Sequence, residues 1–162
     1  MKEYEYSFKV KSIEPYIKYC EENGYTKEEE TTQNRTLYRN VNKTMARITA
    51  KTKNGKTKTV LDFKDDNRAD VVLKVSRETI PLEVTPENEK AIDSILDMLE
   101  YTKDKTLIRT RMVYKKGNVT FEIDKYDAPE VMFVVAIEGE KEEVDKTYAV
   151  VKEKINNEIE EN

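Results

Sequence analysis

Residues 107–124 read LIRTRMVYKKGNVTFEID, and this stretch decides the fold. In its first half, charged side chains alternate with neutral ones, so Arg109 and Arg111 share one face of a strand. After a Lys-Gly-Asn turn, Glu122 and Asp124 alternate with apolar neighbours in the same way. The stretch therefore predicts a β-hairpin that has one charged face and one apolar face.

The same period-two alternation recurs in other parts of the chain. Residues 2–11 place aromatic and aliphatic side chains on one face and Glu3, Glu5 and Lys9 on the other. Residues 26–32 are expected to form a polar loop. In all, the sequence predicts eight strands, at 2–11, 33–40, 44–52, 57–64, 70–78, 105–115, 118–125 and 131–139.

Apolar residues at helical spacing predict three helices, at 13–22, 85–100 and 142–159. The last is expected to pack on the outside of the sheet. The sequence contains no internal repeat, low-complexity tract or linker, so residues 1–162 are expected to form a single domain.

Two architectures of the α+β class fit this pattern. Eight antiparallel strands can close into a barrel, whose lumen would receive the charged faces, including Arg47 and Lys64. An open antiparallel sheet with one solvated face has the same alternation. Periodicity alone does not separate the two.

Composition narrows the classes of function. The chain of 162 residues is 38% charged, with a formal net charge of −4. This argues against a partner such as duplex nucleic acid or a membrane surface, since proteins that bind either one usually carry a basic excess. A single cysteine, and the lack of any apolar stretch that could serve as a signal or a membrane span, indicate a cytoplasmic protein.

The chain contains no histidine, which excludes Ser-His-Asp and Cys-His catalysis and imidazole ligation of zinc. Any bound metal must therefore sit on oxygen ligands. Such ligands favour Mg²⁺ or Mn²⁺, ions that commonly neutralise phosphate oxygens.

The first strands resemble those of the CYTH family, the triphosphate tunnel metalloenzymes. That family begins with Glu-x-Glu-x-Lys, and this chain has Glu3-x-Glu5-x-Ser7, in which serine replaces the lysine. Residues 45–49 (MARIT) are similar to the family's Ala-Leu-Arg-Ile-Arg strand, with Thr49 in place of the second arginine. Leu61-Asp62-Phe63-Lys64 resembles its Leu-Thr-x-Lys strand.

Later segments continue the resemblance in the same order, over about 140 residues in all. Residues 108–114 are similar to the family's Lys-x-Arg-x-x-Tyr strand, and residues 121–124 to its strand ending in Leu-Asp. Residues 134–138 resemble Phe-x-Glu-Ile-Glu, with Ala136 in place of the first glutamate. Arg77 is a candidate for a further family arginine.

The resemblance implies an eight-stranded antiparallel tunnel with a site inside it. Glu3, Glu5 and Glu138 are implied metal ligands for Mg²⁺ or Mn²⁺, and Asp124 is added to that set. The implied substrate-binding residues are Arg47, Lys64, Arg77, Arg109 and Arg111. The implied catalytic residues are Glu3, Glu5 and Lys9, the last because it shares a face with Ser7, about 7 Å further along the strand.

The function implied is divalent-metal-dependent hydrolysis of an organic triphosphate, a nucleoside or thiamine triphosphate, inside the tunnel. Met132, Val134 and Ala136 share a face with Glu138, which indicates room for the organic part of such a ligand. An adenylate cyclase of class IV is a second interpretation. The departures at Ser7 and Ala136, with that at Thr49, leave open a third, a non-catalytic protein that binds a phosphorylated small molecule.

Overall fold

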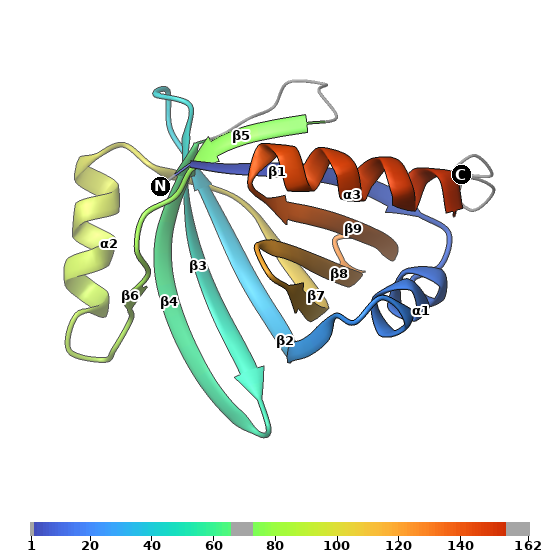
Figure 1. The fold of residues 1–162 in the computed structure, drawn as a ribbon. Helices are drawn as coiled ribbons and strands as arrows, with labels where there is room; N and C mark the ends of the chain where they lie inside the picture. Colours follow the sequence, from blue (N-terminus) through green and yellow to red (C-terminus); the bar gives the residue numbers. More distant parts are fainter. Residues whose placement is uncertain (1, 66–72, 155–162) are drawn as a thin grey trace.

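The computed structural model describes residues 2–65 and 73–154 of the chain. Within these ranges nine strands and three helices follow one another (Figure 1). They are β1 (Lys2–Val10), α1 (Glu14–Glu22), β2 (Thr26–Arg39), β3 (Thr44–Lys53), β4 (Lys56–Asp65), β5 (Leu73–Arg77), β6 (Leu82–Glu83), α2 (Glu89–Met98), β7 (Thr102–Lys116), β8 (Val119–Ala128), β9 (Met132–Gly139) and α3 (Lys141–Lys154).

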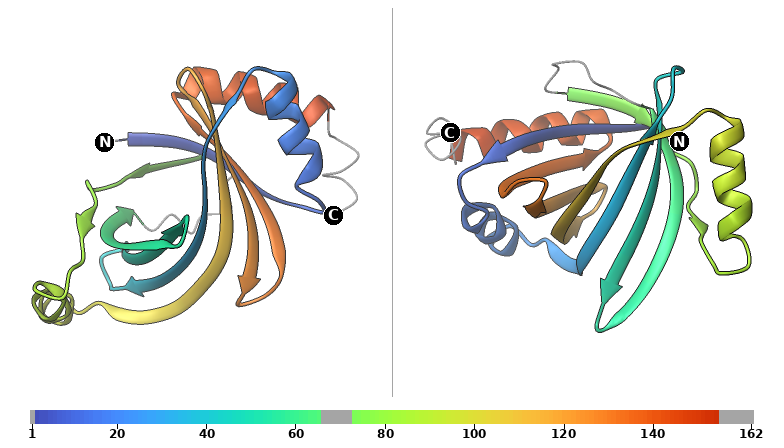
Figure 2. Two further views of the ribbon diagram at one scale, coloured as in Figure 1. Left: turned by 90° about the horizontal axis from the view of Figure 1, so that it is seen from below. Right: turned by 180° about the vertical axis from the view of Figure 1, so that it is seen from behind.

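All nine strands belong to one antiparallel sheet, in the order β5-β1-β9-β8-β7-β2-β3-β4-β6. The sheet curls strongly, and the view from below in Figure 2 shows its curved cross-section. The structure is therefore a half-barrel with a concave and a convex face. The expected α+β class and antiparallel pairing are confirmed. The expected closure into an eight-stranded barrel is not shown, because the strand order has two ends, β5 and β6.

The expected polar loop at residues 26–32 is wrong, because these residues form the first half of β2. The whole of β2 pairs with β7, from Thr26 opposite Lys115 to Arg39 opposite Thr102. This segment lacks apolar alternation because its inward side chains, such as the buried Thr31, face a polar surface. The ninth strand, β6, is a two-residue pairing with β4 that is too short to produce a periodic signal.

The three helices are confirmed, with shifted boundaries. Helix α2 begins at Glu89, later than expected, because Thr85 and Asn88 first close a turn. In that turn the Thr85 backbone N–H donates to Asn88 Oδ1 at 2.7 Å, and the Asn88 N–H donates to Thr85 Oγ1 at 3.3 Å. The predicted ends at 155–159 of the last helix and at 70–72 of the fifth strand lie outside the described residues. None of the helices in the described ranges is long and apolar enough to cross a membrane.

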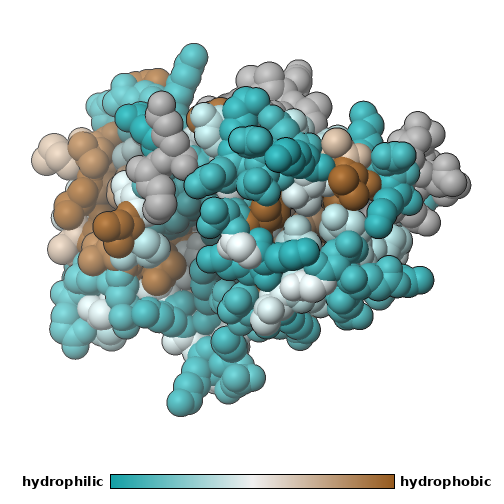
Figure 3. Space-filling view, viewed as in Figure 1, coloured by the Kyte–Doolittle hydropathy of each residue, from teal (hydrophilic) through white to brown (hydrophobic). Residues whose placement is uncertain are grey.

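Two apolar clusters cover the convex face. Helices α1 and α3 pack over one half of the sheet, around buried residues such as Phe121, Ile137 and Val144. Helix α2 covers the other half through Ile92 and Leu96, as Figure 1 shows at the left. Its outer side remains apolar and exposed, and Figure 3 shows this patch over α2. The helices thus occupy the convex face and leave the concave face to charged side chains.

Candidate active site

A cavity of about 350 Å³ lies on the concave face of the sheet. Side chains from β1, β2, β3, β4, β7, β8 and β9 line it, because the inward-facing residues of successive strands stand side by side. The residues predicted from the sequence that line this cavity are Glu5, Arg47, Lys64, Arg109, Arg111, Asp124 and Glu138.

Three predicted residues lie elsewhere. Glu3 lines a neighbouring pocket, although its carboxyl is close enough to Glu138 to help raise the pKa of that group. Lys9 is exposed and does not line the cavity. Arg77 is also exposed and pairs with Asp65, whose Oδ2 lies 3.0 Å from Arg77 Nε. The structure therefore separates Lys9 and Arg77 from the residues that it brings together.

Three carboxylates crowd one end of the cavity. Glu5, Glu122 and Glu138 each place a carboxylate oxygen within 4.8 Å of the other two. Glu5 and Glu138 are direct partners across β1 and β9, and Glu122 reaches them from β8. Like charges this close repel one another unless a cation or a proton lies between them. Sequence analysis placed Glu122 on the right face but did not assign it to the metal set.

Two of these partly buried carboxyls respond in opposite ways to their surroundings. Burial, then the charge of Glu122 and hydrogen bonds with Glu122 and Glu3, raises the pKa of the Glu138 carboxyl well above its ordinary value. Burial also opposes ionisation of Glu122, but the Arg111 guanidinium outweighs it and holds the pKa of that carboxyl well below its usual range. In the absence of a metal ion, the group therefore favours a proton on Glu138.

Arg111 is already occupied by acids of the protein itself. Its Nε and Nη2 donate to the two oxygens of Asp124 at 2.8 and 2.9 Å, and its Nη1 donates to Glu122 Oε2 at 2.7 Å. This bidentate pairing is the strongest geometry available to a guanidinium and a carboxylate. It uses three of the five guanidinium N–H groups and both Asp124 oxygens.

Arg47 is held in a similar way on the opposite wall. Its Nε and Nη2 donate to Asp62 at 2.9 and 2.5 Å, and Nη2 also donates to Glu78 Oε1 at 3.2 Å. Lys64 Nζ lies 3.4 Å from the same Glu78 oxygen. The acids Asp62 and Glu78 therefore neutralise two of the predicted phosphate-binding cations.

Arg35 lines the cavity but was missed by sequence analysis. Its Nε donates to Thr49 Oγ1 at 2.8 Å. Burial and the positive charges of Arg109, Arg47 and Arg111 lower the pKa of Arg35 well below its ordinary value. Arg35 therefore belongs to a group of cations that repel one another. The sequence holds one signal for Arg35: it lies two residues from Gln33 in a predicted strand, so the two side chains share a polar face.

Two positions that depart from the CYTH motifs lie opposite residues that carry the missing charge. Thr49, which replaces an arginine, is the direct cross-strand partner of Arg35. Ala136, which replaces a glutamate, is the direct partner of Glu122. In both cases the charge reaches the same part of the concave face from the adjacent strand. One-dimensional motif matching does not detect such an exchange, because the two residues are far apart in the sequence.

No protein-family model and no curated protein matches the sequence, but solved structures do. A protein from Pyrococcus horikoshii superposes with a TM-score of 0.69 at 21% identity, over 93% of this chain and 89% of that one. The putative adenylyl cyclase of Hippeastrum, which has a dominant triphosphatase activity, gives 0.65 at 13% identity, over 96% and 87%. A putative adenylate cyclase from Bacillus halodurans gives 0.62 at 13%, over 94% and 88%.

The fold and the site define the class: an α+β protein whose strongly curled antiparallel sheet surrounds a charged concave face. Within that class, the chain shares its fold with putative adenylate cyclases, and this agrees with the fold that the resemblance to the CYTH family implies.

Proposed function

We propose that the protein is a divalent-metal-dependent phosphohydrolase that acts on an organic triphosphate bound in the cavity of the concave face. One observation carries this proposal: crowded carboxylates and crowded guanidinium groups line the same cavity. A metal ion relieves the first repulsion, and an anion relieves the second. A metal complex of a polyphosphate supplies both.

The metal would be held by Glu5, Glu122 and Glu138, whose donor set fits Mg²⁺ or Mn²⁺ because it consists of carboxylate oxygens alone. Bound there, the ion would neutralise phosphate oxygens and polarise the phosphorus centre. Metal binding would displace the proton that Glu138 favours. The protein's own contribution is to orient these carboxylates, with Arg111 keeping Glu122 ionised.

The organic part of the substrate would lie against a neutral stretch of the wall. Ser7 and Ala136 are direct partners across β1 and β9, and Val134 lines the cavity beside them. A stretch without charge in an otherwise charged cavity suits a nucleoside or thiamine group better than a further phosphate.

We further propose that the curled sheet closes into a tunnel around the ligand. Lys64 of β4 forms an antiparallel bridge with Glu78, and the Thr79 N–H donates to the Phe63 carbonyl at 3.0 Å. Glu78 and Thr79 directly follow β5, which pairs with β1 at the opposite end of the strand order from β4. The triphosphatase activity of the Hippeastrum protein, which shares the fold, agrees with the proposed hydrolysis of a triphosphate.

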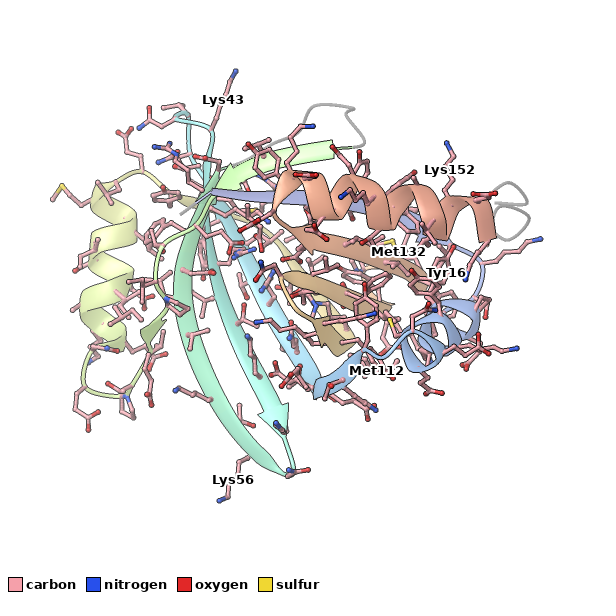
Figure 4. The ribbon with its side chains drawn as sticks, in the orientation of Figure 1. Tyr16, Lys43, Lys56, Met112, Met132 and Lys152 are labelled. Carbon is pink, nitrogen blue, oxygen red and sulfur yellow. The ribbon has the colours of Figure 1, made fainter. Side chains whose placement is uncertain are left out.

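Phosphate release tests the proposal. ATP, GTP, thiamine triphosphate and tripolyphosphate should each be incubated with the protein, with Mg²⁺, with Mn²⁺ and with EDTA. We expect metal-dependent release from an organic triphosphate, and its loss in Glu138→Gln. Lys56→Gln is a matched control, since Lys56 projects from the tip of the β3–β4 hairpin, away from the cavity (Figure 4). The absence of phosphate release under every condition contradicts the proposal.

A non-catalytic binding protein is the second candidate, and the exposure of Lys9 outside the cavity favours it. It predicts ligand binding without product. Ser7→Lys combined with Ala136→Glu would then create an activity that the natural protein lacks. If ATP yields cyclic AMP instead of ADP and phosphate, the protein is an adenylate cyclase.

A further inference from the structure

We infer that Arg35 and Arg109 hold the phosphoryl group of the ligand, and that the motif arginines Arg47 and Arg111 serve to pair the acids of the cavity. The inference rests on the proposed function, because it locates the anion in the same cavity. It assigns phosphate binding to Arg35, which matches none of the CYTH motifs. It assigns no phosphate binding to Arg47 and Arg111, which do match them.

The hydrogen bonds of the four arginines support this division. A guanidinium offers five N–H donors in one plane, and a carboxylate that accepts from Nε and one Nη occupies the side-on edge, where a phosphate could otherwise bind in the same bidentate way. Asp124 takes this edge of Arg111, and Asp62 takes that of Arg47. Each arginine also reaches a second acid, Glu122 and Glu78 respectively. A ligand would have to break these charge-assisted bonds before it could bind the side-on edge of either arginine, and the acids already balance both positive charges.

The hydrogen bonds of Arg109 and Arg35 go to neutral groups, and Asp124, whose Oδ2 lies 3.9 Å from Arg109 Nη1, accepts its hydrogen bonds from Arg111 instead. Arg109 Nε donates to Gln33 Oε1 at 3.0 Å, and Nη1 donates to the Tyr126 hydroxyl at 2.8 Å. Only 3% of the Arg109 side chain is exposed, so water does not readily reach it. Its Nη2 is buried and has no hydrogen-bond partner among residues 2–65 and 73–154. A buried donor without an acceptor lowers stability, so an anion that accepts from Nη2 would gain affinity.

The register brings the two guanidinium groups to one place. Arg109 is the direct partner of Gln33 across β7 and β2, and Arg35 lies two residues beyond Gln33 on the same face. Such diagonal neighbours lie about 7–8 Å apart at the backbone, within reach of long side chains. Both side chains line the cavity. A phosphoryl group, with several acceptor oxygens and up to two negative charges, can accept from both at once.

Two independent positioning bonds support the role of this pair. Gln33 is only 2% exposed; it receives its hydrogen bond from Arg109 and donates from Nε2 to Thr31 Oγ1 at 3.0 Å. Thr49, only 1% exposed, accepts from Arg35. Neutral partners of this kind orient a guanidinium without cancelling its charge. Burial, and then the positive charges of neighbouring arginines, lowers the pKa of Arg35, which agrees with a site suited to an anion.

The test is calorimetric titration of tripolyphosphate in EDTA, so that neither metal binding nor turnover contributes. We expect Arg35→Gln to weaken binding by about tenfold to 100-fold, the range for loss of a hydrogen bond to a charged group. Arg35→Lys should recover part of this loss. The double variant Arg47→Gln/Asp62→Asn keeps the net charge and should bind within about threefold of the natural protein. Lys56→Gln controls for removal of one positive charge outside the cavity.

Thermal unfolding supplies a second readout, because a binding role and a structural role of Arg35 predict opposite changes in the unfolding temperature of the ligand-free variant. Arg35→Gln removes a cation that its neighbours repel, so the ligand-free variant should unfold at the same or a higher temperature than the natural protein. Its stabilisation by tripolyphosphate should be smaller. A purely structural Arg35 would instead give a lower unfolding temperature and unchanged stabilisation by the ligand.

The outcomes separate this inference from the proposed function. Tripolyphosphate binding that depends on Arg35, without phosphate release from any triphosphate, supports the inference and contradicts the enzyme. Phosphate release with an unchanged affinity in Arg35→Gln, or a loss of affinity confined to Arg47→Gln/Asp62→Asn, overturns the inference and leaves the enzyme in place. A natural protein that does not bind tripolyphosphate at all overturns the inference.

Discussion

The two faces of strand β8 have opposite requirements. On the convex face, Phe121 and Ile123 are fully buried and need only complementary shape from α1 and neighbouring strands. On the concave face, Glu122 and Asp124 need specific charged partners, and Arg111 supplies them. The comparison shows that the convex face is complete without a ligand. On the concave face, by contrast, burial and neighbouring acids oppose ionisation of Glu138, and burial and neighbouring cations oppose the charge of Arg35.

The largest effect on stability is expected on the convex face. Phe121 contacts Tyr25 edge-on, with ring centroids 5.0 Å apart, and Tyr19 at 5.8 Å. Phe121→Ala leaves a cavity there and should lower the free energy of unfolding by about 3–5 kcal/mol, measured by urea denaturation. Activity at a temperature where the variant remains folded should persist. A change below about 1 kcal/mol would show that this cluster is not the core.

A somewhat smaller loss is expected when a concave ion pair is broken. Arg111→Gln leaves Asp124, which is only 2% exposed, without its bidentate partner. Because the Arg111 side chain remains 15% exposed, the expected loss is about 2–4 kcal/mol, below that of a fully buried pair. Arg111→Gln/Asp124→Asn should recover part of it. Equal stability of the single and double variants would contradict this interpretation.

A smaller effect, dependent on pH, is expected at Glu138. Its pKa is raised in the folded protein above the ordinary value of 4.5, so between these two values the folded state binds a proton that the unfolded state lacks. The contribution of Glu138 to stability should therefore fall as the pH rises through this window. The free energy of unfolding should be measured against pH for the natural protein and for Glu138→Gln. The difference between the two curves gives the contribution of Glu138, apart from the opposite contribution of Glu122.

Adding Mn²⁺ sharpens the same experiment. At neutral pH the ion should stabilise the natural protein, by about 2.7 kcal/mol at 100 times its dissociation constant, and should stabilise Glu138→Gln much less. Equal stabilisation of both proteins would exclude Glu138 as a ligand.

The smallest effect is expected for an ion pair on an exposed helix surface. Lys18 Nζ lies 3.9 Å from Glu22 Oε1 in α1, with 75% and 62% of the two side chains exposed. Lys18→Ala should change the free energy of unfolding by less than about 0.5 kcal/mol. A larger change would mean that charge pairs outside the cavity also contribute substantially, which would weaken the contrast between the two regions.

Much of the fold could be predicted because alternation directly reports a strand with two different faces. The charged faces at 107–124 and at Glu5 were predicted in this way and line the same cavity. The first half of β2 was missed because its side chains are polar on both faces, so no alternation marks it. Barrel closure was expected from the resemblance and is not shown, because closure depends on how β5 and β6 end the sheet, which alternation does not report.

Local pattern was thus sufficient for the antiparallel strands, the three helices and a charged face, because each depends on side chains a few residues apart. Cross-strand pairing determined which charges act together. The placement of Arg35 opposite Thr49, and of Glu122 opposite Ala136, joins residues of different strands through register alone. Register is a property of the folded sheet, so the charges that are cancelled and those left for a ligand become visible only in three dimensions.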